Sequence, residues 1–242
     1  MDAWIERWSR VSPGVFRWAG VAVLVALPIF LVTLNVRALF NAPLVYNTGF
    51  ERNRIAENTG LPASEIERVG DEIREYLGNE QEYMTIFLHA RPLFTAREVE
   101  HMRDVKALLG LVYTVTYVTG AAVLVYAAWG FRREGVRFLR RTSMAGAVGG
   151  VGLVATGIVL ALGFPVFFTL FHQISFSNDY WILNPSEHFL VVLFPYRFWL
   201  EATVLLAVLT VAEAAAIWGV SRYLHRRLAS GPEDAETPNP TA

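Results

Sequence analysis

Two histidines, His101 and His172, are the residues of this sequence whose types and neighbours best suit chemistry. His101 comes three residues before Asp104, and His172 comes six residues before the pair Asn178-Asp179. Histidine is the usual general acid or base near neutral pH, and a neighbouring carboxylate can fix its tautomer and support its cationic form. An asparagine such as Asn178 can donate a hydrogen bond to a developing oxyanion. The pattern favours acid-base catalysis on an ester or a related carbonyl group.

Three further side chains are candidates for supporting or substrate-binding roles. Lys106 is the only lysine, since all other basic residues are arginine, and its point charge suits a phosphate or an oxyanion. Chance accounts for a single lysine equally simply. Arg97 comes four residues before His101, and Trp181 follows the Asn-Asp pair closely, although Trp181 also fits the aromatic belt of a membrane interface.

The composition places the chain among membrane proteins. Of its 242 residues, 54% are hydrophobic, and the apolar residues form long blocks rather than amphipathic periods. A helix needs about 20 mostly apolar residues to cross the hydrocarbon core. Four stretches meet this requirement: 16–40, 107–131, 142–171 and 198–221. We expect a mainly α membrane protein with four transmembrane helices, the first of which is too long for a signal peptide and stays as an uncleaved anchor.

The basic residues indicate the orientation, because short loops rich in arginine are retained on the cytoplasmic side. Five arginines lie in the loop between the second and third spans, and three follow the fourth: Arg132, Arg133, Arg137, Arg140, Arg141, Arg222, Arg226 and Arg227. Both termini are therefore predicted to be cytoplasmic in a plasma membrane protein. The segments 41–106 and 172–197 then face outside. The net charge of −1 argues against a nucleic-acid partner.

The chain is thus expected to have four parts. These are a cytoplasmic N-terminus with the first transmembrane helix (1–40), a small extracytoplasmic cap (41–105), the transmembrane helices 2–4 with an outer interfacial loop at 172–197 (106–228), and a disordered cytoplasmic tail (229–242). The tail is assigned as disordered because it consists mainly of Gly, Pro, Ser, Thr and acidic residues.

The cap is expected to have a mixed α/β structure. Ser64 and Glu67 form a capping box, and apolar residues then recur at helical spacing until Gly78-Asn79, which predicts one amphipathic helix. The segments 44–46 and 83–88 are short, apolar and rich in β-forming residues, so we expect them to pair as strands. A later stretch starting with Asn184 and Pro185 predicts a short interfacial helix that runs to residue 194.

The helix of the second span is predicted to begin well before the apolar block. Thr95 and Glu98 make a second capping box, and no helix breaker follows before residue 131. Arg97, His101 and Asp104 lie on one stripe of this helix, together with Leu108. His101 precedes the apolar block by six residues, roughly 9 Å at 1.5 Å per residue. This depth matches the ester groups of a membrane lipid or a lipoprotein.

Other functions are compatible with the same residues. Each histidine alone can be an amphipathic interfacial residue without a catalytic role. His101, His172 and His188 with a carboxylate are a possible metal set, but no close ligand spacing such as HExxH occurs, and we predict no metal and no cofactor. Glu201 and Glu213 lie in the fourth span and are expected to be far from basic partners. Such carboxylates inside a membrane are compatible with a proton path, so a small transporter is a further alternative, as is a non-catalytic scaffold. The absence of cysteine excludes thiol nucleophiles.

Two motifs resemble the signature regions of the lipoprotein intramolecular transacylase (Lit) family of bacterial membrane proteins. They are FTAREVEHMRDVKALL at 94–109 and FHQISFSNDYWILNPSEHFLVVLFPYRFW at 171–199. The order of the spans and the outside cap agree with this family, so the resemblance covers about residues 15–225.

The resemblance implies an enzyme that moves the sn-2 acyl chain of a diacylglyceryl lipoprotein to the α-amino group of that protein's own N-terminal cysteine. The product is a lyso-form lipoprotein. The partners would be the lipoprotein substrate and membrane lipid. On the matching positions, His101 and His172 are the candidate catalytic pair. Our own hypothesis for their roles is that His172 takes a proton from the amine, while His101 polarises the ester or protonates the departing glycerol oxygen. Asp104, Lys106, Asn178 and Asp179 are assigned supporting roles.

The sequence departs from the family pattern at two places. His188 stands where the family has an aspartate, and Tyr196-Arg197 stand where an acidic residue follows the late proline. Both places adjoin the expected site, so they concern the substrate more than the chemistry. A related lipid acyl hydrolase or a metal-dependent lipid enzyme is the alternative.

Overall fold

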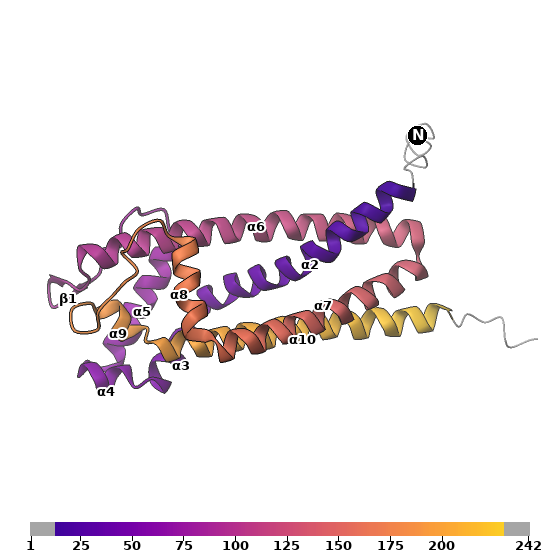
Figure 1. Ribbon diagram of the computed structural model, residues 1–242. Helices are drawn as coiled ribbons and strands as arrows, with labels where there is room; N and C mark the ends of the chain where they lie inside the picture. Colours follow the sequence, from indigo (N-terminus) through magenta and orange to yellow (C-terminus); the bar gives the residue numbers. More distant parts are fainter. Residues whose placement is uncertain (1–12, 230–242) are drawn as a thin grey trace, which may run out of the picture. The chain divides into compact units, whose positions relative to one another are not determined.

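The computed structural model describes residues 13–229, and it is mainly helical, as the sequence predicts. The helices and strands are α2 Pro13–Asn41, α3 Pro43–Arg52, α4 Ile55–Thr59, α5 Ala63–Gly78, β1 Phe87–Leu88, β2 Arg91–Pro92, α6 Ala96–Glu134, α7 Val136–Leu162, α8 Phe164–Ser175, α9 Phe189–Leu193 and α10 Tyr196–Ala229 (Figure 1). The first twelve residues and the predicted tail, apart from Ala229 in α10, lie outside the described residues.

Three of the described helices are long and apolar enough to cross a membrane. The candidate spans are Ala96–Arg133, Phe138–Val159 and Tyr196–Ala229. A fourth results if Val25–Asn41 and Pro43–Arg52, which meet at an angle of 71°, form one bent span. Ala42, at the break, has an extended backbone, because the proline that follows it disfavours the helical conformation.

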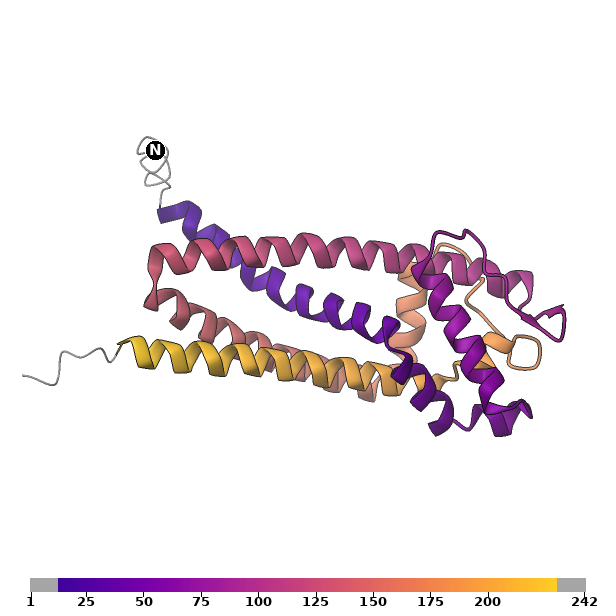
Figure 2. The ribbon, with the colours of Figure 1, turned by 180° about the vertical axis from the view of Figure 1, so that it is seen from behind.

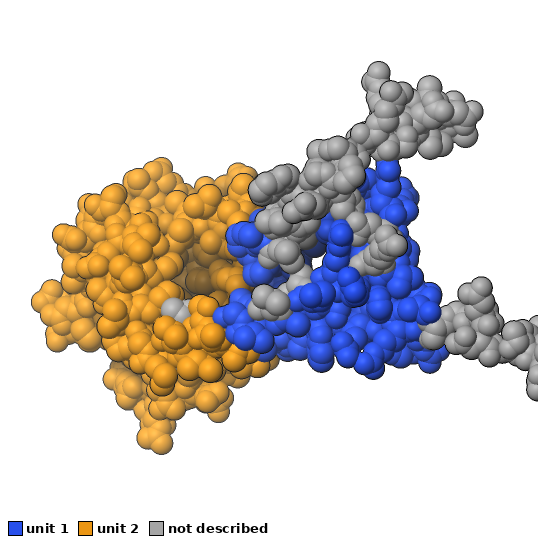
Figure 3. All heavy atoms as spheres, turned by 45° about the vertical axis from the view of Figure 1, so that its right-hand side comes forward, with its two compact units in different colours: residues 1–31, 117–153, 210–242 blue, residues 32–116, 154–209 orange. Residues whose placement is uncertain are grey.

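The chain divides into two compact units, which Figure 3 distinguishes by colour. The described part of the first unit comprises residues 13–31, 117–153 and 210–229. Glycine allows close helix packing there: a Cβ atom on Gly146 would lie 3.2 Å from the backbone nitrogen and the Cβ atom of Trp218. Small residues at such positions are typical of packing faces between membrane helices.

The second unit, residues 32–116 and 154–209, contains every candidate site residue. Figures 1 and 2 show α3, α4, α5 and α9 gathered at the end of α6 that holds its first turns, with α3 and α4 farther from α6 than α5 and α9 are. The apolar stripe of α5 is fully buried, with Ile66, Val69 and Ile73 at most 2% exposed. Each such side chain contributes about 1.5–3 kcal/mol through burial. This core holds the start of α6 and the segment after α8 in place.

The structure corrects two predictions for the cap. Residues 44–46 are helical, not a strand: Pro43 occupies the first turn of α3, and Tyr46 and Phe50 are buried at helical spacing. A short apolar run does not separate strand from helix by itself. Within residues 83–88, Phe87–Leu88 is a strand, and it pairs with Arg91–Pro92 in a hairpin.

The helix starts also differ in part. The helix α5 begins at Ala63, with Pro62 at its N-cap and no side-chain cap, so the capping box of Ser64 and Glu67 is not formed. The predicted helix after Asn184 begins only at Phe189, because residues 185–187 form a turn in which the Asn184 side chain accepts from the backbone N–H of Ser186 (3.1 Å).

The expected third span is interrupted. The helix α7 ends at Leu162, and α8 starts at Phe164 and is steeply inclined to the last turns of α7 (Figure 1). Pro165 lies in the first turn of α8, where its missing N–H costs nothing and where it cannot continue the preceding helix. His172 therefore belongs to a separate helix rather than to the end of a span.

A candidate acid-base site with two histidines

The two histidines lie side by side. His101 comes from the second turn of α6 and His172 from the last turn of α8, and their ring centroids are 6.0 Å apart with 34° between the ring planes. Each is only 8% exposed. A small reactive group placed between two rings at this separation would be within reach of both.

Aromatic side chains surround the pair. The ring of Phe176 lies 5.3 Å from that of His101 and 5.6 Å from that of His172, measured between centroids. Phe168 and Trp181 pack on His172 at 4.3 and 5.1 Å. Trp181, predicted as a supporting residue, therefore contacts one histidine directly. This apolar wall excludes water from the histidine rings.

One hydrogen bond fixes the tautomer of His172. Its Nδ1 lies 2.7 Å from the carbonyl oxygen of Phe168. Because a carbonyl oxygen only accepts, Nδ1 must carry the proton, which leaves the lone pair on Nε2. Burial lowers the pKa of His172 below its usual value, and the bond to the Phe168 carbonyl opposes this shift in part. The neutral ring with a basic Nε2 is thus favoured near neutral pH.

His101 has an unsatisfied ring nitrogen. Its Nδ1 is buried and has no hydrogen-bond partner among the described residues. A buried polar atom without a partner costs about 1–3 kcal/mol. Asp104, which the sequence suggested as the orienting carboxylate, instead accepts a hydrogen bond from the Nδ2 of Asn178 (2.8 Å).

Arg97 and the pair of Asp104 and Asn178 hold the segment after α8 on α6. The Arg97 guanidinium donates to the backbone carbonyl of Asp179 and to that of Ile182 (3.3 Å). The carbonyl oxygen of the Asn178 side chain accepts from the backbone N–H of Tyr180 (3.1 Å). The predicted stripe on α6 thus faces this segment, and its polar members fix the segment that carries Trp181.

Two predicted supporting residues are not in contact with the histidines. In the part of the chain that the structure describes, the exposed Asp179 carboxylate has no recorded hydrogen bond or ion pair. The Lys106 ammonium donates to the Asn79 side chain (2.9 Å) and the Gln81 carbonyl (2.6 Å), and it lies 4.3 Å from the Tyr76 ring centroid. Lys106 therefore ties α6 to the end of α5.

Glu98 is a residue whose full role the sequence did not reveal. Its carboxylate accepts from the backbone N–H (2.7 Å) and the hydroxyl (2.9 Å) of Thr95, which confirms the predicted capping box. The second carboxylate oxygen accepts from the backbone N–H of Leu190 at 2.6 Å. Glu98 is completely buried. It thereby joins the start of α6 to α9, a link that no local pattern predicts.

The groups behind the alternative functions lie elsewhere. His188 bonds to the backbone of its neighbour Asn184. Among residues 13–229, no group of three His, Asp or Glu side chains could hold a metal ion. Glu201 was expected to lie far from basic partners, and this was wrong: it pairs with Arg197 (3.0 Å), one helical turn before it, and with Arg52 (3.6 Å).

The fold thus combines apolar helices long enough to cross a membrane with a buried pair of histidines, and it belongs to the class of helical membrane proteins. The family model of the lipoprotein intramolecular transacylase Lit matches residues 21–199, and the chain therefore belongs to this family.

Solved structures have the same fold. The structure of Lit from Bacillus cereus superposes with a TM-score of 0.78 at 20% identity, covering 90% of this chain and 99% of that one. A variant of that protein with a histidine replaced by arginine gives a TM-score of 0.73 at 19% identity, over 89% of this chain and 94% of that one.

A curated relative shows similarity over a shorter part. An uncharacterized protein of Aquifex aeolicus is 30% identical over 120 residues, which are 48% of this chain and 51% of that protein. The match thus spans about half of the length of this relative.

Proposed function

We propose that this protein transfers the sn-2 acyl chain of a diacylglyceryl lipoprotein to the α-amino group of the same lipoprotein's N-terminal cysteine, which yields a lyso-form lipoprotein. Membership of the Lit family supports this activity. The observation that carries the chemistry is the buried pair of His101 and His172, 6.0 Å apart between ring centroids, with the tautomer of His172 fixed by a carbonyl.

His172 is the base in this proposal. Its Nε2 takes a proton from the cysteine amine as the nitrogen attacks the sn-2 ester carbonyl. The carbon-oxygen bond to glycerol then breaks, and the proton taken up by His172 passes through His101 to the departing oxygen. An amide N–C bond forms and an ester C–O bond breaks, the amine proton ends on the glycerol hydroxyl, and both histidines return to the neutral state. Donor and acceptor belong to one molecule, and the site needs mainly to hold them close.

The supporting residues have two kinds of role in this proposal. Arg97, Asp104 and Asn178 position the segment that follows α8, whereas Trp181 closes the space beside His172. The exposed carboxylate of Asp179 is available to the substrate, for instance to its amine. Lys106 is hydrogen-bonded to the end of α5, so it stabilises the packing of the cap and does not contact the ester.

The aromatic wall favours transfer over hydrolysis. Phe168, Phe176 and Trp181 pack on His172, the proposed base, so a water molecule competes poorly with a tethered amine for activation there. This arrangement supports a transacylase over the related acyl hydrolase.

The membrane topology is part of the proposal. Four spans, with α2 and α3 counted as one bent span, place both termini in the cytoplasm, since the arginines of the 132–141 loop and of the end of α10 then lie inside. The helices α4 and α5 and the hairpin then form an extracytoplasmic cap. The histidines then lie at the outer leaflet, where lipoproteins carry their diacylglyceryl groups.

The test is mass spectrometry of lipoprotein N-terminal peptides from a bacterial strain that makes diacylglyceryl lipoproteins and lacks N-acyltransferases. Expression of the wild type should convert the diacyl peptide to an N-acyl, S-monoacyl peptide of unchanged mass, distinguished by fragmentation. An unchanged diacyl peptide in the presence of well-expressed protein would reject the activity. Loss of one acyl chain as free fatty acid would indicate the hydrolase instead.

A further inference from the structure

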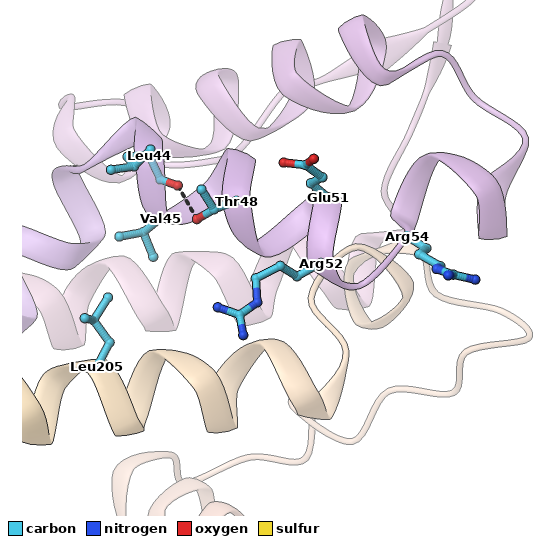
Figure 4. Close-up of a pocket in the computed structure, with 7 residues that line it drawn as sticks. All are labelled: Leu44, Val45, Thr48, Glu51, Arg52, Arg54 and Leu205. Carbon is cyan, nitrogen blue, oxygen red and sulfur yellow. Dashed lines mark hydrogen bonds between the residues drawn. The ribbon is translucent and has the colours of Figure 1, made fainter.

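A cavity of about 650 Å³ lies between α3 and the first third of α10. It is lined by Leu44, Val45, Thr48, Glu51, Arg52, Arg54 and Leu205 (Figure 4). Neither histidine lines it, and the proposed transfer makes no use of it. A volume of this size is within the range of about 300–1,000 Å³ that is typical of small-molecule sites.

Both helices that border this cavity change from charged to apolar along their length, and Arg197, which does not itself line the cavity, lies at the charged end through its ion pair with Glu201. On α3, Arg52 lies eight residues after Leu44, and on α10, Arg197 lies eight residues before Leu205, which is about 12 Å in each case. Arg52 and Arg197 share the carboxylate of Glu201, and Leu44 and Leu205 line the same cavity. The two helices therefore run in opposite directions and place like residues opposite each other.

The charged end has an excess of hydrogen-bond donors. Arg52 lies 3.6 Å and Arg197 3.0 Å from the carboxylate of Glu201, so two guanidinium groups share one negative charge. Both arginine side chains are 66% exposed, which leaves most of their N–H groups free for another acceptor. Glu51 does not neutralise this pair, because its carboxylate points away from the Arg52 guanidinium (Figure 4).

The apolar end is open. Leu44 is 71% exposed and Leu205 is 39% exposed, although both border the cavity. Exposed leucines next to candidate membrane spans are the contacts that a hydrocarbon chain would make. The cavity thus offers guanidinium groups at one end and an apolar groove about two helical turns away.

We propose that this cavity binds one anionic glycerophospholipid, with its phosphate on Arg52 and Arg197 and one acyl chain along Leu44, Val45 and Leu205. Guanidinium groups suit phosphate because their N–H donors form a planar fork. The apolar half of the cavity selects a lipid over a free phosphate ion.

The test is native mass spectrometry of the full-length protein in a non-ionic detergent, titrated with dioleoyl phosphatidylglycerol. The wild type should retain one such lipid, and dioleoylglycerol, which lacks the phosphate, should bind at least about tenfold more weakly. The double variant Arg52→Gln/Arg197→Gln should lose affinity about tenfold. The control is Arg68→Gln/Arg74→Gln, which removes two partly exposed arginines of α5 and should leave retention unchanged.

A variant that is expected to increase lipid affinity separates charge recognition from misfolding. Glu201→Gln removes the carboxylate that Arg52 and Arg197 share, so it should tighten phosphatidylglycerol binding several-fold. The proposal would be overturned if the wild type, Arg52→Gln/Arg197→Gln and Glu201→Gln all retained phosphatidylglycerol equally well. Competition by glycerol 3-phosphate at the same concentration as lipid would reduce the site to a bare anion site. Displacement by a stoichiometric diacyl lipopeptide would reassign it to the substrate.

Discussion

Glu98 offers a quantitative test of how α6 and α9 are joined. Its buried carboxylate accepts from the backbone N–H groups of Thr95 and Leu190 and from the Thr95 hydroxyl. In Glu98→Gln, one carboxylate oxygen becomes an NH₂ group, and in either orientation this group faces a backbone N–H donor. One charge-assisted hydrogen bond, worth about 1.5–3 kcal/mol, is therefore lost while the volume is kept.

The expected loss can be expressed as a melting temperature. For a chain of this size, 1 kcal/mol shifts the Tm by about 2–4 °C, so Glu98→Gln should lower it by about 3–12 °C. Glu98→Ala should lower it further, because it also leaves the Leu190 N–H unsatisfied and removes the cap. The assay is thermal unfolding of the purified protein, monitored through tryptophan fluorescence.

Glu100→Gln is the matched control. Glu100 lies two residues further along α6 and pairs with Arg103 at 3.0 Å on a partly exposed surface. Such pairs contribute about 0–1 kcal/mol, so its Tm should fall by at most about 4 °C. If Glu98→Gln melts together with the wild type and Glu100→Gln, the assigned link between Glu98 and Leu190 is not a stabilising one.

Three other predictions follow from the site and the core. The imidazole NMR signals of His172 should titrate below pH 6.5, since burial lowers its pKa and the neutral ring persists as the pH falls; a midpoint at or above 6.5 would refute its role as a neutral base. Asn178→Asp places two carboxylates together and should slow acyl transfer, and the exchanged pair Asp104→Asn/Asn178→Asp should restore most of the rate; equal rates for the single and double variants would mean that this bond does not position the site. Gly49→Ala should lower the Tm by about 2–12 °C, because its Cβ would overlap with the ring of the buried Phe198, and an unchanged Tm would show that this contact relaxes freely.

Local patterns in the sequence predicted much of what positions the site. The capping box of Thr95 and Glu98, the unbroken helix that follows it and the common face of Arg97, His101 and Asp104 depend on contacts between residues three or four apart. Such contacts are set by helix geometry, so a single sequence reveals them. The two histidines were expected at the outer interface for a different reason, because His101 precedes the second apolar block and His172 directly follows the third.

The remaining features depend on partners that are far apart in the sequence or on breaks between helices. His172 bonds to the Phe168 carbonyl within α8, which is a separate helix, whereas the sequence had suggested one continuous span. The bond between Glu98 and Leu190 joins residues 92 positions apart. The run 44–46 was misassigned as a strand because the packing of Tyr46 on Phe194 and Phe198, not the length or composition of the run, favours its helical structure.

The most direct test of the account is a product analysis with purified protein and a diacyl lipopeptide labelled with carbon-13 in its sn-2 acyl chain. Wild type, His101→Asn, His172→Asn and the control His188→Asn are compared by mass spectrometry. The account predicts that the label moves to the cysteine nitrogen with the wild type and the control, and that each of the other two variants lowers this transfer at least about 100-fold. Transfer at the wild-type rate by either variant would contradict the role of the histidine pair.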